Sequence, residues 1–252
     1  MPYLKLDRKR IYYASSRNKE KGLIPLLLIH GAGGSHRHWL FQIEGVDYPI
    51  IAVDLPGHGR SEGQALNSIE AYADLMLNFI HEISPKGIYV GGHSMGGAIT
   101  LKLALKAPEL IKAMVLIGTG GRLRVKQKIL NTFAAGNNLP ELIEWAYGPE
   151  ANQDLTTAAH QEWINGSSKV FYNDFSACNE FDVTNYLEQL KMIPTTVICG
   201  TSDLMTPPKY SEFLKERLKA ELNLINNAGH MSMLENPNQV NTILEQFLRK
   251  LG

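Results

Sequence analysis

The chain of 252 residues has little of several features that mark specialised classes of protein. It has two cysteines, Cys178 and Cys199, which lie in different segments without the spacing of a metal site or a disulfide framework. Its 25 basic and 25 acidic residues cancel, so it lacks the charge excess that binding to nucleic acid or a membrane surface requires. No apolar run is long enough to span a bilayer, and the N-terminus has no signal-peptide core. We therefore expect a protein of the reducing cytoplasm, without a nucleic-acid partner or stable membrane insertion.

Short apolar runs alternate with helical patterns along most of the chain. The runs typical of buried strands are Leu26–Ile29, Ile50–Val53, Ile88–Val90, Ala113–Ile117, Thr196–Cys199 and Leu222–Ile225. Helical periodicity begins near Ser68 and again after Pro237. The alternation predicts an α/β fold with a mostly parallel central sheet flanked by helices. Two further runs, Tyr3–Leu6 and Arg10–Ala14, predict an antiparallel pair at one edge.

One region interrupts this rhythm. Residues 120–186 contain no convincing strand, and short stretches with glycine, proline, asparagine or serine divide them into helical pieces rich in aromatic residues. We expect a helical insertion that covers one end of the sheet. The predicted organisation is a core of residues 1–119 and 187–252, with residues 120–186 as the insertion.

Ser94 is the strongest candidate for a reactive side chain. It lies in Gly92-His93-Ser94-Met95-Gly96, directly after a strand-like run and directly before a helical run. This pattern predicts a sharp strand-to-helix turn that presents a hydroxyl at its tip. Gly92 and Gly96 leave room where a side chain would clash. The helix N-terminus favours negative charge at the same place.

A serine hydroxyl needs a base, and a carboxylate must orient that base. His230 follows the run Leu222–Ile225 across a short loop, and Asp203 follows the run Thr196–Cys199. Both therefore lie at the carboxyl edge of the predicted sheet, where Ser94 also lies. Asp54 ends another strand, but the glycine-rich stretch after it favours a loop-bracing role. The chain order of serine, aspartate and histidine is that of a nucleophile-elbow hydrolase.

Two backbone N–H groups are candidates for an oxyanion hole. One belongs to Met95, the residue after the serine, and the other to Ala32, in the loop His30-Gly31-Ala32-Gly33-Gly34. His36 and His38 have a spacing that could bind a metal, but no third ligand accompanies them, so a metal site there is disfavoured.

These motifs together resemble the α/β-hydrolase superfamily. The resemblance rests on His30-Gly31-Ala32-Gly33-Gly34, the run from Asp54 to Ser61, the turn around Ser94, Asp203 and Ala228-Gly229-His230. The sequence is most similar to small capped carboxylesterases and monoacylglycerol-lipase-like hydrolases. In such proteins the equivalents of Ser94, Asp203 and His230 form a catalytic triad, and the insertion is a cap over the pocket.

The resemblance implies a serine hydrolase that cleaves small-molecule carboxylic esters of small or medium acyl chains through an acyl-enzyme, without a metal or organic cofactor. Met231, Trp145 and Trp163 are candidates to line its acyl pocket. Thioesterase, lactonase, C–C hydrolase and hydroxynitrile lyase chemistry would use similar residues, and a ligand receptor with slow turnover would share the fold. A dinucleotide site at Gly31 and Gly33 is disfavoured because His36 occupies the position of the third glycine.

Overall fold

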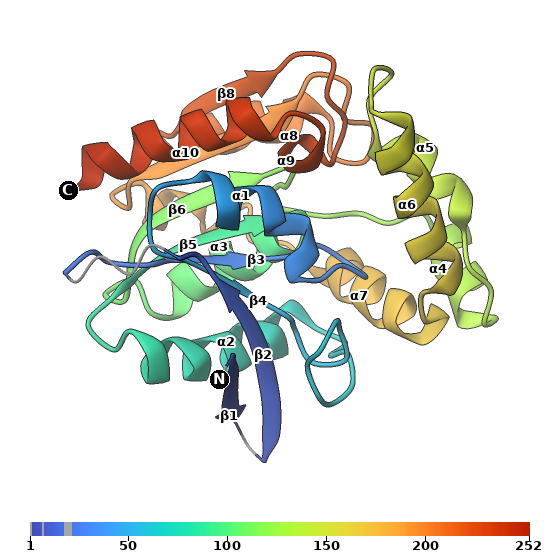
Figure 1. Cartoon of the computed structure of the whole chain (residues 1–252), viewed down its shortest axis with the longest axis horizontal. Coiled ribbons are helices and arrows are strands. Elements are labelled where there is room, and N and C mark those ends of the chain that lie inside the picture. Colours follow the sequence, from blue (N-terminus) through green and yellow to red (C-terminus); the bar gives the residue numbers. More distant parts are fainter. Residues whose placement is uncertain (1, 7, 18–21) are drawn as a thin grey trace.

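The computed structural model of the chain describes residues 2–6, 8–17 and 22–252. Its centre is an eight-stranded sheet in the order β1-β2-β4-β3-β5-β6-β7-β8 (Figure 1). The strands are β1 (Tyr3–Leu6), β2 (Lys9–Ser15), β3 (Leu26–Ile29), β4 (Ile50–Val53), β5 (Ile88–His93), β6 (Ile111–Ile117), β7 (Thr195–Gly200) and β8 (Glu221–Ile225).

The pairing of the strands confirms the predicted sheet. Strands β3 to β8 pair in parallel, whereas β1 pairs with β2, and β2 with β4, in the antiparallel sense. The predicted edge pair is therefore present. Because the strands from β3 to β8 run in one direction, the loops that follow them all leave from the same edge of the sheet.

Helices cover both faces of the sheet. Those of the core are α1 (Leu40–Gly45), α2 (Ile69–Ile83), α3 (Met95–Lys106), α8 (Pro208–Leu218), α9 (Ser232–Glu235) and α10 (Pro237–Leu251), with short 3-10 turns η1 (His36–Trp39) and η3 (Leu187–Leu190). The Ser68 side chain caps α2 by accepting a hydrogen bond from the Ala71 N–H. The Asn236 side chain caps α10 by accepting a hydrogen bond from the Gln239 N–H.

Residues of β3 show how the two faces are buried. Leu27 and Ile29 pack in one hydrophobic cluster with α2 and α3, and Leu26 and Leu28 pack in a second cluster with α10. Successive side chains of a strand point to opposite faces, so a strand covered on both sides must be apolar at every position. The continuous run Leu26–Ile29 meets that requirement.

The chain between β6 and β7, all of which the structure describes, forms no strand of the sheet. It contains α4 (Gln127–Ala134), η2 (Pro140–Leu142), α5 (Ile143–Ala146), α6 (Gln153–Asn165) and α7 (Ser168–Glu180). These helices lie together beyond one end of the sheet (Figure 1). They share a small core of their own, made of Leu130, Phe133, Leu139, Leu142, Phe171 and Phe175.

In the described parts of the chain, every helix is too short or too polar to cross a membrane.

Candidate active site

Ser94 lies at a strained turn between β5 and α3. It is a non-glycine residue with a positive φ of 52° and a ψ of −113°. A side chain on Gly92 would overlap the backbone of Gly96, and one on Gly96 would overlap the Ile29 carbonyl oxygen. The two glycines therefore allow the first turn of α3 to pack against the ends of β3 and β5. This close packing maintains the unusual backbone conformation of Ser94. It also holds the half-buried Ser94 side chain at the edge of the sheet.

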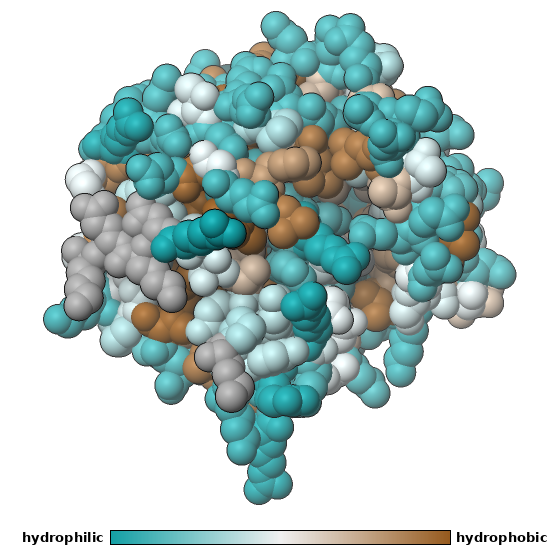
Figure 2. Space-filling model, viewed as in Figure 1, coloured by the Kyte–Doolittle hydropathy of each residue, from teal (hydrophilic) through white to brown (hydrophobic). Residues whose placement is uncertain are grey.

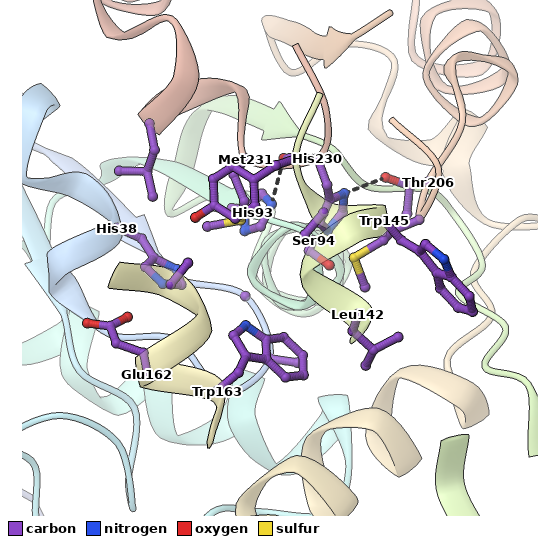
Figure 3. A pocket seen from close by; sticks show the side chains of 18 of the residues that line it. His38, His93, Ser94, Leu142, Trp145, Glu162, Trp163, Thr206, His230 and Met231 are labelled. Atoms are coloured by element: carbon purple, nitrogen blue, oxygen red, sulfur yellow. Dashed lines mark hydrogen bonds between the residues drawn. The ribbon is translucent and has the colours of Figure 1, made fainter. Parts of the chain in front are cut away.

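His230 and Asp203 form a buried pair at the same edge. His230 Nδ1 lies 2.8 Å from Asp203 Oδ2, and both residues are almost fully buried. His230 and Ser94 line one cavity, and Figure 3 shows both side chains in its wall. A hydrogen bond at Nδ1 leaves Nε2 as the ring nitrogen available to a hydroxyl. The structure thus brings together the serine, histidine and aspartate that the sequence singled out.

The Asp203 carboxylate is held by its own loop. Its Oδ1 accepts hydrogen bonds from the N–H groups of Met205 (2.9 Å) and Thr206 (2.8 Å). The Thr206 hydroxyl donates to Oδ2 at 2.9 Å and lies 3.2 Å from His230 Nδ1. Burial acts to raise the pKa of Asp203, but His230 and the hydrogen bonds from His230 and Thr206 outweigh it and lower that pKa. The carboxylate is therefore ionised at neutral pH and can stabilise a positive charge on the imidazole.

His93 is a second buried imidazole next to His230. The two ring centroids are 4.5 Å apart, and His93 Nε2 lies 3.0 Å from the backbone oxygen of His230. Burial lowers the pKa of His93 well below its usual value, so the ring is neutral and Nε2 carries the donated hydrogen. This contact ties the loop that carries His230 to the end of β5, directly before Ser94.

Of the two backbone candidates for an oxyanion hole, Met95 directly follows Ser94, and Ala32 lines the same cavity as Ser94. Met95 is the first residue of α3, so its N–H has no acceptor within the helix. Ala32 lies in the cavity wall. The next two N–H groups of its loop are already engaged, since Gly33 donates to Asp174 Oδ2 at 2.8 Å and Gly34 to the Gly31 oxygen at 3.1 Å.

A cavity of about 670 Å³ opens above these groups, between the sheet edge and helices α4 to α7. Its wall is mostly apolar and includes Leu142, Trp145, Trp163 and Met231 (Figure 3). Trp163 stacks on Phe171 with ring centroids 4.7 Å apart. Near α1 and α9, hydrophobic side chains gather on the surface shown in Figure 2. In that part of the molecule, Leu40, Phe41 and Leu234 also line the cavity.

Other residues close in sequence to the candidate site lie in different surroundings. Met205 lines the cavity with Met231, whereas Met95 and Met233 are buried in the core. Asp54 accepts hydrogen bonds from the backbone of His36 and Arg60, which is the loop-bracing role expected of it.

Three residues with contacts around the candidate site were not identified from the sequence: His93, Thr206 and Asp174. Thr206 follows Asp203 at a spacing at which an aspartate often accepts hydrogen bonds from its own loop, and that spacing was a usable signal. Asp174 lies between Phe171 and Phe175 on the apolar side of α7, where an acidic residue is unusual. Nothing in the sequence indicates the contact of His93 with His230.

The parallel sheet, the strained serine turn and the cavity at the carboxyl edge define an α/β hydrolase. A model of the alpha/beta hydrolase family matches residues 26–243, and the chain therefore belongs to that family.

Several relatives carry esterase or lipase names. The chain is 31% identical to Lipase 3 of Moraxella sp. over 237 residues, which are 84% of this chain and 73% of that protein. It is 27% identical to Putative esterase/lipase 2 of Mycoplasma pneumoniae over 220 residues, 81% of each chain. Among solved structures, a thermophilic esterase is 31% identical with a TM-score of 0.87, and the match covers 99% of this chain and 97% of that one.

Another relative is longer than this chain. The dihydrolipoyllysine-residue acetyltransferase component of the acetoin cleaving system of Pseudomonas putida is 28% identical over 243 residues. The match covers 91% of this chain but 65% of that protein, so the chain spans just under two thirds of its length.

Proposed function

We propose that the protein is a serine hydrolase that cleaves carboxylic esters with small or medium apolar acyl groups. The observation that supports this most directly is the buried His230–Asp203 pair, 2.8 Å apart, in the wall of the cavity that Ser94 also lines. Esterase and lipase names among the relatives agree with it. The substrate would be a small molecule, and the chemistry described below needs no metal or organic cofactor.

The reaction would proceed by two acyl transfers. His230 Nε2 takes the proton of the Ser94 hydroxyl as Oγ attacks the ester carbonyl, and a tetrahedral oxyanion forms. The intermediate expels the alcohol, which receives the proton from His230. Water then enters, gives a proton to His230 and attacks the acyl-enzyme. Collapse of the second intermediate releases the carboxylic acid and returns the proton to Ser94. Asp203 keeps the imidazole in one tautomer throughout.

The N–H groups of Ala32 and Met95 would stabilise the oxyanion. Removing one such donor typically slows an enzyme about a hundred- to a thousand-fold, because the charge develops in a site that water cannot fully solvate. Met95 gains further from its place at the N-terminus of α3, where the helix dipole favours negative charge.

The apolar wall above Ser94 would bind the acyl group. We propose that residues 120–186 act as a cap and that Trp145, Trp163 and Met231 help to shape the acyl site. All three line the cavity, and Met231 directly follows the proposed base. A flexible thioether beside rigid aromatic rings suits a pocket that accepts acyl groups of more than one shape.

A chain-length series of p-nitrophenyl esters, together with mass labelling by a fluorophosphonate, tests the proposal. We expect turnover by the wild type and one phosphonate bound, on Ser94. Ser94→Ala and His230→Ala should lower kcat more than about a thousand-fold while the melting temperature stays near that of the wild type. Asp203→Asn should be nearly as damaging, because it favours the wrong imidazole tautomer.

His160→Ala is a matched control, since His160 is exposed on α6 and does not line the cavity. Retention of activity by Ser94→Ala or His230→Ala would refute the assignment. Ligand binding without turnover would instead identify a receptor. Faster cleavage of thioesters or lactones than of matched esters would change the substrate class.

A further inference from the structure

Asp174 is an acidic residue buried where the helical segment meets the core. It lies on α7, has no exposed surface, and is not part of the described cavity wall. Its Oδ1 accepts a hydrogen bond from the Tyr72 hydroxyl at 2.7 Å. Its Oδ2 lies 2.8 Å from both the Gly33 nitrogen and His58 Nε2. One carboxylate from the insertion therefore binds three separate parts of the core.

The surroundings of Asp174 compensate for its burial. A buried carboxylate is costly unless charge and hydrogen bonds replace its water. Burial acts to lower the pKa of His58, but the Asp174 charge and the hydrogen bonds of His58 to Asp174 and Pro56 outweigh it and raise that pKa. The Tyr72 hydroxyl and the Gly33 N–H complete the shell. Gly33 and His58 contact Oδ2, whereas Tyr72 donates to the other oxygen, Oδ1.

The contact with Gly33 reaches the proposed oxyanion hole. Gly33 directly follows Ala32, and its N–H belongs to the peptide unit that joins the two residues. The peptide unit before Ala32 is also held, because the Gly31 oxygen accepts from the Gly34 N–H (3.1 Å) and lies 2.8 Å from His30 Nδ1. Peptide units are planar and trans, so fixing the Gly31 oxygen on one side directs the Ala32 N–H to the other.

The loop also lies flush against α7. Gly33 has a φ of 67°, a conformation that favours glycine, and a side chain there would overlap the Phe171 ring. Phe171 is three residues before Asp174 on the same helix and lines the cavity. The position of the donor loop is thus set by α7 through a hydrogen bond and a ring contact.

We propose that Asp174 is a positioning residue for the oxyanion hole. By holding the Gly33 N–H, it keeps the Ala32 N–H directed at the oxyanion, and it makes that geometry depend on the docking of α7. The proposal rests on the serine hydrolase function proposed above. Removing one oxyanion donor typically slows catalysis about a hundred- to a thousand-fold. Misplacing the donor should have a smaller effect, so we expect kcat to fall about 10- to 100-fold.

Asp174→Ala tests this role, with Tyr72→Phe as the matched control. The control removes the hydrogen bond to Oδ1, and with it the acceptor of the Leu66 N–H, but leaves the bond from Gly33 to Oδ2. We expect Asp174→Ala to lower kcat about 10- to 100-fold per active site titrated with a fluorophosphonate, with KM changed less than about threefold. Tyr72→Phe should keep kcat within about twofold of the wild type, and Asp174→Asn, whose amide oxygen can still accept from Gly33, should recover most of the loss.

Amide hydrogen exchange at Gly33 gives a readout that does not depend on turnover. The Gly33 amide should be protected in the wild type and in Tyr72→Phe, and should exchange at least about tenfold faster in Asp174→Ala. Fast exchange of this amide in the wild type would overturn the proposal even if the alanine variant failed to fold. Unchanged kcat per titrated site in a folded Asp174→Ala would also overturn it. A wild type that neither hydrolyses esters nor takes the phosphonate label would instead refute the proposed function.

Discussion

His93 donates a hydrogen bond from Nε2 to the backbone oxygen of His230 at 3.0 Å, and the two rings pack 4.5 Å apart. The residue before the proposed nucleophile therefore helps to hold the residue proposed as its base. A rigid link of this kind reduces the freedom of the loop after β8, where His230 would otherwise be placed by the short segment 226–229 alone.

Replacing His93 by phenylalanine should slow the reaction without unfolding the protein. The variant keeps a ring against His230 but leaves the His230 carbonyl oxygen without its donor, and one such hydrogen bond contributes about 1 kcal/mol. We expect kcat to fall about threefold to tenfold. Steady-state kinetics on a p-nitrophenyl ester would measure it. The same substitution at the exposed His160 is the control, and a kcat for His93→Phe equal to that of the control would contradict this role.

Thr206→Val should impair the Asp203–His230 pair. Valine has nearly the shape of threonine but lacks the hydroxyl that donates to Asp203 Oδ2 at 2.9 Å and lies 3.2 Å from His230 Nδ1. We expect kcat to fall about threefold to thirtyfold, because one buried carboxylate oxygen loses a donor worth about 1.5–3 kcal/mol. Thr206→Ser retains the hydroxyl and should stay close to wild-type activity. Equal rates in the valine and serine variants would show that the hydroxyl is dispensable.

The His58–Asp174 contact should make part of the stability depend on pH. The pKa of His58 is raised in the folded protein, whereas in the unfolded chain it is about 6.5. The stabilisation is therefore complete below about pH 6.5 and is lost as the pH rises through the folded value. In His58→Gln this contribution should be absent.

Thermal unfolding of wild type and His58→Gln across pH 5.5 to 9 would measure the effect. Other buried histidines, such as His30 and His38, have pKa values lowered by burial. Because they are present in both proteins, the difference between the two curves reports the contribution of His58. The difference in melting temperature should shrink as the pH rises. A difference that stays constant or grows would contradict the expected charge on His58.

Gly96→Ala should disrupt the turn that carries Ser94. The new side chain would overlap the backbone oxygen of Ile29, which cannot move without displacing β3. We expect a loss of about 3 kcal/mol or more in the free energy of unfolding, the upper end for overpacking a core. Denaturant unfolding would measure it. Gly121→Ala is the control, because the nearest atom to its side chain is the end of the Leu187 side chain at 2.9 Å and no backbone atom is among its closest neighbours. Equal losses in the two variants would contradict the argument.

Much of the sheet was predictable because burial on both faces demands continuous apolar runs. The bounds predicted for β3 and β4 match the structure. Strand β5 extends three residues beyond its predicted end, through Gly91 and Gly92 to His93. Glycine has little intrinsic preference for strands, but here the backbone is paired with β3 on one side and β6 on the other. Tertiary pairing therefore set that boundary, and local sequence could not reveal it.

The placement of Ser94, Asp203 and His230 at one edge was predictable for a similar reason. Each follows a strand of a parallel sheet, and the carboxyl ends of such strands meet. The contacts of His93 and Asp174 were not predictable, because they join segments far apart in the chain. His93 meets a residue 137 positions away, and Asp174 reaches Gly33 across 141 positions. Periodicity and motif spacing carry no information about such pairs.

The order of the strands also has a consequence for folding. Strands β3, β4, β5 and β6 are contiguous in the sheet and come before helices α4 to α7, whereas β7 and β8 follow these helices and add to one edge. A folding intermediate built from the earlier strands alone would already present the Ser94 hydroxyl, yet its general base and the carboxylate would still be on unstructured chain. If the proposed triad is correct, such an intermediate would be inert toward esters, and recovery of activity after denaturant removal would report docking of the last two strands.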